Sequence, residues 1–343
     1  MQFIIYKPIC FIMKKTTLFI GGLLVVVAMM FVSCHKEIVP TINNYFTVDN
    51  ATLVAKEMPN PSLDGALEVL MNPKVIPGGT SYASVTSDIV PAKIIVGMKD
   101  QKGYYEAAPN AHDGVYSFVM VVNQDITLKD KETSFVVLVG LEDANGNVST
   151  LTENTVELMS SVGTGKLQVS LSFDNAKDLD LHLIEPEQVD ADGYEYSYSD
   201  RHICYFNSLS RNGGELDLDS NAGCLVDGVN NENITYGEDA YVAPGMYQVY
   251  VDLFENCDPQ DLPTNWVVSV FYEGTLIAAQ SGGNPVSGTF PADAEDNWGA
   301  LGNLQPVMTF VIPDKGQQRV KTFAPKPLTP TAMEKKATAD ALN

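Results

Sequence analysis

The sequence predicts an all-β protein with two antiparallel β-sandwich domains behind an export signal. Three observations lead to this class. Short runs rich in Val, Thr and Tyr recur along the chain, turn formers are abundant (26 Gly and 19 Pro), and few stretches have helical spacing. With 343 residues, of which 45% are hydrophobic and 19% charged, the chain is long enough for two or three globular domains.

The chain is strongly acidic, with a formal net charge of −22 at pH 7. This charge argues against nucleic acid as a partner, because phosphate binding needs a basic surface. It permits cation binding, and it equally suits a solvated surface that keeps the protein soluble. Charge alone therefore leaves both explanations open.

Residues 13–34, MKKTTLFIGGLLVVVAMMFVSC, are organised like a secretory signal that ends in a cysteine. Two lysines precede an uncharged apolar stretch, and a small residue lies directly before Cys34. This ending resembles the lipobox of bacterial lipoproteins, which implies that Cys34 is acylated and becomes the mature N-terminus. Residues 1–33 would then be a signal peptide, with Met13 a better start than the first residue, and residues 34–40 a lipid-anchored tether.

The lipoprotein interpretation places the protein on the outer membrane of a Gram-negative bacterium, on the cell surface or the periplasmic face. An uncleaved transmembrane anchor and ordinary signal cleavage are the alternatives. Removal of residues 1–33 deletes three lysines and no acid, which lowers the formal net charge from −22 to −25. Anionic head groups would repel so acidic a body, so we expect contact with the membrane through the lipidated Cys34 alone.

Residues 41–162 are predicted to form the first sandwich. The strand-like runs SYASVTSDIV, AKIIVGMKD, GVYSFVMVV and TSFVVLVGLED alternate with the turn signals PGG, NAHDG and DANGN. The runs DGVYSFVMVV and FVVLVGLEDANGNVS resemble the last strands of bacterial immunoglobulin-like modules. The resemblance implies a spacer domain, with an adhesive face as the functional alternative.

A small-residue linker, residues 160–166, leads into a second predicted sandwich of jelly-roll type over residues 166–313. Its expected strands are GKLQVSLSF, DLDLHLIEP, ICYFNS, GMYQVYVDLFE, NWVVSVFYEG and VMTFVIP. The linker SSVGTGK lacks the spacing of a phosphate-binding loop, since Leu167 follows its lysine. Residues 314–343 are polar and rich in Pro and Lys, which predicts a flexible C-terminal tail.

Two segments of the second unit alternate leucine with polar, mostly acidic residues. In KDLDLHLIEP the alternating residues are Asp178, Asp180 and His182, and in GGELDLD they include Asp217 and Asp219. Successive strand residues point to opposite faces, so each strand would have one apolar face and one acidic face. The acids are either solvent-facing positions of half-buried strands or ligands of a calcium ion.

Calcium is the sharper hypothesis, because clustered carboxylates repel one another unless a cation neutralises them. The candidate ligands are Asp178, Asp180, Asp217, Asp219 and Glu232. The run DLDSNAG has the D-x-D-x-N spacing of a calcium loop, but Ala222 and Gly228 stand where an EF-hand needs Gly and Glu. His182 is expected to hydrogen-bond a carboxylate, because calcium prefers oxygen ligands.

The segments DLDLHLIEP, YFNSLSRNGGELDLDSNAGCLVDGVNNENI and APGMYQVYVDLFE together resemble the YfaP-like family of uncharacterised bacterial exported proteins. The matching residues are Asp178, Asp180, Leu181, Pro186, Asn207, Ser210, Gly213, Gly214, Leu216, Asp219, Pro244, Gly245, Tyr247 and Val249. The resemblance covers about residues 166–275 and implies a β-sandwich without an established catalytic activity. The loop CLVDGVNNENI is longer than the family's form, which places Asp227 and Glu232 in more doubt than the strand acids.

A carbohydrate-binding lipoprotein of a glycan-uptake system is the alternative function. Tyr194, Tyr196 and Tyr198 fall on one side of a chain expected to be extended, where flat rings would form a ligand platform. The competing explanation is cross-strand packing, in which tyrosines are favoured. A coplanar, exposed row of rings would support sugar binding, and burial would oppose it.

The chain has no enzyme motif, since both the G-x-S-x-G elbow and H-E-x-x-H are missing from its sequence. His112, His182 and His202 lie in unlike contexts, which makes them poor material for a zinc site. We therefore interpret the protein as a non-catalytic binding or structural module, with a glycan or a surface protein as partner and its oligomeric state open.

Three cysteines lie beyond the signal. An oxidising compartment favours one disulfide and one free thiol among Cys204, Cys224 and Cys257. Cys204 with Cys224 is the preferred pair because both flank the same region, although the sequence alone does not decide the pairing.

Overall fold

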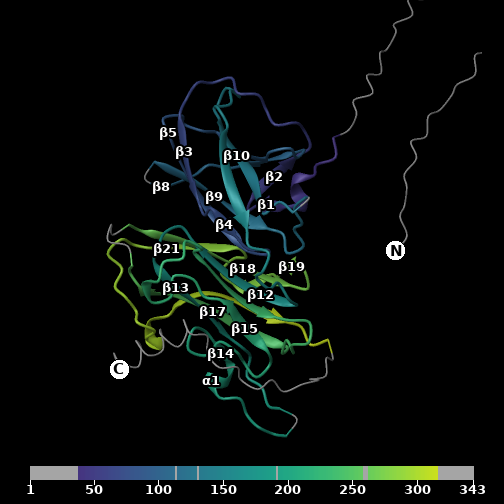
Figure 1. Ribbon diagram of the computed structural model, residues 1–343, viewed down its shortest axis with the longest axis vertical. Helices are drawn as coiled ribbons and strands as arrows, with labels where there is room; N and C mark the ends of the chain where they lie inside the picture. The colour runs from purple at the N-terminus through teal and green to yellow at the C-terminus, as the bar shows by residue number, and fades with distance from the viewer. Residues whose placement is uncertain (1–37, 113, 130, 191, 258–261, 316–343) are drawn as a thin grey trace, which may run out of the picture. The chain divides into compact units, whose positions relative to one another are not determined.

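The computed structural model describes residues 38–315 except residues 113, 130, 191 and 258–261 (Figure 1). The described residues belong to one compact unit. The predicted signal peptide, Cys34 and nearly all of the predicted tail lie outside the described residues. Within the described part of the chain, no helix is long and apolar enough to cross a membrane.

The architecture is all-β and contains two antiparallel sandwiches, as the sequence predicts. The elements of the first sandwich are η1 (Ile42–Asn44), β1 (Phe46–Val48), β2 (Ala51–Val54), β3 (Leu67–Met71), β4 (Lys74–Val75), β5 (Thr80–Ser87), β6 (Lys93–Met98), β7 (Tyr104–Ala107), β8 (Asn110–His112), β9 (Val115–Val122), β10 (Ser134–Glu142) and β11 (Thr152–Leu158). One sheet has the order β1-β9-β5-β3 with β8 on β9, and the other has the order β2-β7-β6-β10-β11-β4. Strands β4 and β11 pair in parallel, and the other pairs in these two sheets are antiparallel.

Alternating burial explains why these runs form strands. Phe135, Val137, Val139 and Leu141 of β10 are at most 5% exposed, whereas Val136 between them is partly exposed. Burying each such side chain stabilises the fold by roughly 1.5–3 kcal/mol. The four predicted strand runs of this unit correspond to β5, β6, β9 and β10, so those predictions are confirmed.

The turn after β10 uses the side chain of Asp143. Its Oδ1 accepts hydrogen bonds from the backbone N–H groups of Asn145 and Asn147, at 2.8 and 2.9 Å. Gly146 has a φ of 81°, which a residue with a Cβ adopts at a cost. In the predicted turn DANGN, the aspartate carboxylate therefore accepts hydrogen bonds from backbone N–H groups in place of backbone carbonyls.

The elements of the second sandwich are β12 (Leu167–Phe173), β13 (Asp178–Ile184), α1 (Tyr198–Arg201), β14 (His202–Ile203), β15 (Gly214–Leu218), η2 (Ala222–Cys224), β16 (Asn231–Tyr236), β17 (Gly245–Glu255), β18 (Thr264–Tyr272), β19 (Thr275–Leu276), β20 (Ala279–Ser281), β21 (Val286–Phe290), η3 (Leu301–Asn303) and β22 (Gln305–Ile312). One sheet has the order β15-β16-β12-β18-β19 with β21 on β18, and the other has the order β14-β13-β17-β22-β20. The predicted strand ICYFNS is wrong beyond Ile203, because Cys204 and Asn207 exchange backbone hydrogen bonds and turn the chain.

The leucines of the alternating segments lie in the core of the second sandwich, as the alternation predicts. Leu179, Leu181 and Leu183 of β13 are 0% exposed, and Leu216 of β15 is 4% exposed. They belong to one hydrophobic cluster that both sheets line. The leucine positions therefore determine which face of β13 and of β15 points into the core.

Strand β12 is buried on its polar face as well as on its core face. Gln168 Nε2 donates to the carbonyl of Pro77 at 2.7 Å, and the hydroxyls of Ser172 and Thr80 lie 2.9 Å apart. These contacts belong to the same compact unit as the rest of the described chain. Small and amide side chains are tolerated there because each finds a hydrogen-bond partner.

Candidate functional site

Strand β13 has no solvent-exposed face. Its three leucines lie in the core, and Asp178, Asp180 and His182 on the opposite face are also 0% exposed. The short turn η2 contacts both β13 and β17. The alternative in which the acids of this strand face solvent is therefore wrong. Burial removes the water that would screen these groups, so each needs a specific partner.

Three of the five predicted calcium ligands come together in a group that we name the acidic cluster: Asp180, Asp219 and Glu232. One carboxylate oxygen of each residue lies within 4.8 Å of the other two. Asp180 and Glu232 are buried, and Asp219 is partly exposed. Glu232 Oε2 also accepts a hydrogen bond from the backbone N–H of Leu181 at 2.6 Å.

The acidic cluster is assembled from both sheets of the sandwich. Asp180 lies on β13 in one sheet, Asp219 directly follows β15, and Glu232 lies on β16 in the other sheet. Carboxylates at this spacing repel one another strongly in a buried position unless a proton or a cation is shared among them. The arrangement can therefore supply oxygen ligands to a hard cation such as calcium.

The other two predicted ligands lie outside this cluster among the described residues. Asp178 Oδ2 accepts a hydrogen bond from the backbone N–H of Gly223 at 2.7 Å, which holds η2 against β13. Asp217 accepts from the backbone N–H of Gly163 at 2.8 Å and from Asn233 Nδ2 at 2.7 Å. Loss of hydration raises the pKa of Asp217 to about 6, and these two hydrogen bonds oppose that rise.

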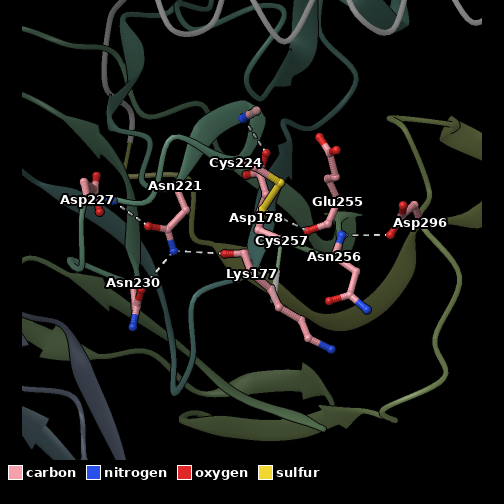
Figure 2. The surroundings of a disulfide bond; sticks show 11 residues. Lys177, Asp178, Asn221, Cys224, Asp227, Asn230, Glu255, Asn256, Cys257 and Asp296 are labelled. Atoms are coloured by element: carbon pink, nitrogen blue, oxygen red, sulfur yellow. Dashed lines mark hydrogen bonds between the residues drawn. A yellow bond between two sulfur atoms is a disulfide. The ribbon is translucent and has the colours of Figure 1, made fainter. Parts of the chain in front are cut away.

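A disulfide fastens the loop beside the acidic cluster to the end of β17. Figure 2 shows the bond between Cys224 and Cys257, whose Cα atoms lie 5.2 Å apart. Cys204 is a free, buried thiol. The preferred pairing of Cys204 with Cys224 is therefore wrong, because Cys204 turns into the sandwich whereas η2 carries Cys224 toward β17.

Asn221 organises the same loop (Figure 2). Its Nδ2 donates to the carbonyl of Lys177 at 3.0 Å and to Asn230 Oδ1 at 2.8 Å, and its Oδ1 accepts from the N–H of Asp227 at 3.0 Å. Asp227 in turn accepts from the N–H of Val229 at 2.8 Å. Asp227 therefore shapes its own loop, whereas Glu232 reaches the acidic cluster despite the unusual length of this segment.

His182 forms the hydrogen bond to a carboxylate that the sequence predicts. Its Nε2 lies 2.9 Å from Asp252 Oδ1, and Asp252 Oδ2 accepts from Asn297 Nδ2 at 2.6 Å. On its other side, His182 Nδ1 lies 2.9 Å from His202 Nε2. The interpretation that the histidines lie in unlike contexts is wrong for His182 and His202, because the pairing of β13 with β14 places Ile184 opposite His202.

The histidine pair adjoins a thiol in a group that we name the His–Cys cluster: His182, His202 and Cys204. All three are 0% exposed, and one ligand atom of each lies within 4.8 Å of the others. Burial and the neighbouring His182 lower the pKa of His202 to about 3. Burial also raises the pKa of the Cys204 thiol well above its usual value, and the charge of Asp180 adds to that rise.

The three tyrosines do not form a flat platform. Tyr194 and Tyr198 are 44% and 43% exposed, but Tyr196 between them is only 6% exposed. The rings of Tyr194 and Tyr196 are tilted by 55°, and Tyr198 begins α1 and packs edge-on against His202. The alternative of a ligand platform made by an extended, exposed row of rings is therefore wrong at this segment.

Glu185 is a buried carboxylate that the sequence did not single out. Its Oε1 accepts hydrogen bonds from Ser210 Oγ and Tyr236 OH, both at 2.7 Å, and its Oε2 accepts from Asn212 Nδ2 at 2.6 Å and Gln188 Nε2 at 3.2 Å. Four donors around one carboxylate make this a structural anchor. An acid directly after a buried strand and before proline was the available signal.

No protein-family model matches the chain. Among solved structures the chain is similar to BcpA, the major pilin subunit of Bacillus cereus, with 11% identity and a TM-score of 0.16. The match covers 66% of this chain and 66% of the pilin. A similarity this low carries no argument about what this chain does, so the buried side chains of the second sandwich are the basis for the proposals below.

Proposed function

We propose that this chain is an exported, lipid-anchored, non-catalytic binding or structural module whose second sandwich is stabilised by calcium. The acidic cluster is the observation that carries the proposal. Asp180, Asp219 and Glu232 come from three separate segments and place carboxylate oxygens within 4.8 Å of one another. Calcium takes oxygen ligands in flexible geometry, and backbone carbonyls or water complete its shell.

The export part of the proposal has two supports. Residues 13–34 have the order of a lipoprotein signal, and the disulfide between Cys224 and Cys257 suits an oxidising compartment. The resemblance of residues 166–275 to the YfaP-like family points to the same kind of exported protein. Its partner would then be a glycan or a surface protein, with the lipid on Cys34 as the membrane contact.

Thermal unfolding of residues 35–343 with calcium and then with a chelator tests the calcium site. A site filled at 100 times its Kd adds ~2.7 kcal/mol to the free energy of unfolding. That gain raises the Tm by several degrees for a unit of this size. We expect Asp219→Asn to abolish the calcium-dependent rise, because it removes the charge of one proposed ligand.

Asp217→Asn is the matched control for this experiment. Asp217 lies two residues away in the same acidic segment, yet its carboxylate binds Gly163 and Asn233 and lies outside the acidic cluster. This variant should keep the calcium-dependent rise in Tm even if its baseline stability changes. An unchanged Tm at millimolar calcium, or an equal loss in both variants, would contradict the calcium proposal.

A further inference from the structure

The His–Cys cluster lies beside the acidic cluster but has different chemistry. His182, His202 and Cys204 offer two imidazole nitrogens and one sulfur within 4.8 Å, and all three side chains are 0% exposed. Aromatic rings surround them: Phe206 packs edge-on against His202, and Tyr205 packs edge-on against His182. Two imidazoles and a thiol are not needed to fill an apolar core, which suggests a ligand.

The hydrogen bonds of His182 orient it as a metal ligand. Asp252 Oδ1 accepts from Nε2, and Asn297 fixes the second oxygen of the same carboxylate. The hydrogen on Nε2 leaves the lone pair of Nδ1 directed at His202. A carboxylate behind a histidine, itself held by a further donor, is the outer shell that commonly supports histidines bound to metals.

One ring nitrogen of His202 is available in the same buried environment. Its Nδ1 is buried and has no hydrogen-bond partner among the residues that the structure describes. A neutral imidazole is the form that binds a metal, and Nε2 of this ring lies 2.9 Å from His182 Nδ1. Moving the ring hydrogen of His202 from Nε2 to Nδ1 would free Nε2 to bind the metal.

We propose that His182, His202 and Cys204 bind a zinc ion. Imidazole and thiolate suit zinc, whereas calcium requires oxygen, so the two clusters select different metals. Tetrahedral zinc with bonds to nitrogen of about 2.05 Å separates two nitrogens by about 3.3 Å. The observed separation of 2.9 Å between His182 Nδ1 and His202 Nε2 needs only a small opening.

Zinc binding converts the Cys204 thiol to a thiolate and releases its proton to solvent. The zinc–sulfur bond forms without any change of oxidation state. The bound zinc would link β13 to β14 and to the turn that follows β14.

Cobalt provides the first test, because Co²⁺ replaces Zn²⁺ and reports its ligands by absorption. Residues 35–343, which contain the compact unit from Ile38, would be titrated with Co²⁺ while the disulfide stays oxidised. Cys204 is then the one free thiol. We expect a sulfur-to-cobalt charge-transfer band at one equivalent and its loss when excess Zn²⁺ is added. Failure of this band to develop would overturn the proposal.

Two variants separate this site from the proposed calcium site. Cys204→Ser should abolish the charge-transfer band, whereas Asp219→Asn should keep the band while it loses the calcium response. A band that persists in Cys204→Ser, or one that disappears equally in both variants, would overturn the assignment of these ligands. Circular dichroism of each metal-free variant checks that it is folded.

X-ray absorption of the zinc-loaded, unaltered chain tests the proposal without any variant. We expect a first shell that contains one sulfur and two imidazole nitrogens, together with the release of one thiol proton per zinc in weakly buffered solution. A shell of oxygen and nitrogen without sulfur would overturn the proposal. That outcome would leave the calcium proposal standing, because it rests on separate residues and a separate titration.

Discussion

Glu185 and Asp180 are both buried carboxylates, but their neighbours differ in kind. Glu185 is surrounded by the hydrogen-bond donors of Ser210, Asn212 and Tyr236. Asp180 lies beside other carboxylates and an imidazole. The first environment stabilises a negative charge with hydrogen bonds, whereas the carboxylates of the second repel one another. At the residue scale, neighbouring carboxylates therefore distinguish a candidate ligand from a structural carboxylate.

Tyr236→Phe tests the structural role of Glu185. The hydroxyl of Tyr236 donates to a buried carboxylate, and such hydrogen bonds contribute about 1.5–3 kcal/mol to the free energy of unfolding. Tyr247→Phe is the control, because the Tyr247 hydroxyl donates to the neutral carbonyl of Ala243 and should cost about 0.5–1.5 kcal/mol. Urea unfolding measures both losses, and equal losses would contradict the proposed difference.

The lowered pKa of His202 predicts that the stability of the fold depends on pH. Its folded pKa of about 3 lies below the ordinary value of 6.5, so between these values the unfolded chain binds a proton that the folded chain does not. The contribution of neutral His202 to the free energy of unfolding is fully present above pH 6.5. It decreases as pH falls, by up to about 1.4 kcal/mol per pH unit. In EDTA, His202→Asn should show a shallower decline than the unaltered chain between pH 6.5 and 4. Identical slopes would contradict a lowered pKa of His202 in the folded state.

At the scale of elements, strands β13 and β14 and the turn η2 decide which side chains meet. Strand β13 carries Asp180 toward the acidic cluster and His182 toward the His–Cys cluster. Its pairing with β14 brings His202 to His182, and η2 is held to the end of β17 by the disulfide of Cys224. These short elements have little stability of their own, so their cross-links position the candidate ligands.

The disulfide should contribute measurably to stability. Cys224 and Cys257 are separated by 33 residues, and closing a loop of this length stabilises the folded state by about 3–4 kcal/mol in the chain-entropy model. We expect the double variant Cys224→Ser, Cys257→Ser to lose this amount in urea unfolding and to become insensitive to reductant. Peptide mapping without reductant should recover the linked pair and a free Cys204. A linked Cys204 would refute the assigned pairing.

At the scale of the whole molecule, the strands combine into one compact unit with a large negative charge. The core clusters account for its apolar strand faces, and the buried polar face of β12 finds partners around Pro77 and Thr80. The acidity suits a body that stays away from an anionic membrane. In the proposed function, a lipid at Cys34 is the membrane attachment.

Lipidation is tested by Cys34→Ser in the intact precursor. We expect this variant to lose fatty-acid labelling and to move from the membrane pellet to the soluble fraction, because no acyl chains remain to hold it. Cys10→Ser is the matched control, since Cys10 precedes the start proposed at Met13. A Cys34→Ser protein that is still labelled and pelleted would contradict the lipoprotein proposal.

The sequence by itself determined the all-β class, the main strands and the inward direction of leucines such as Leu181, because period-two alternation is a local property of the chain. It also indicated that His182 would bond a carboxylate. Only the tertiary structure decided that Asp252 is that carboxylate, 70 residues away, and that Cys224 pairs with Cys257. The burial of Asp180 and its meeting with Glu232 were decided there too. The reason is that such contacts depend on strand pairing and loop path, which alternation does not encode.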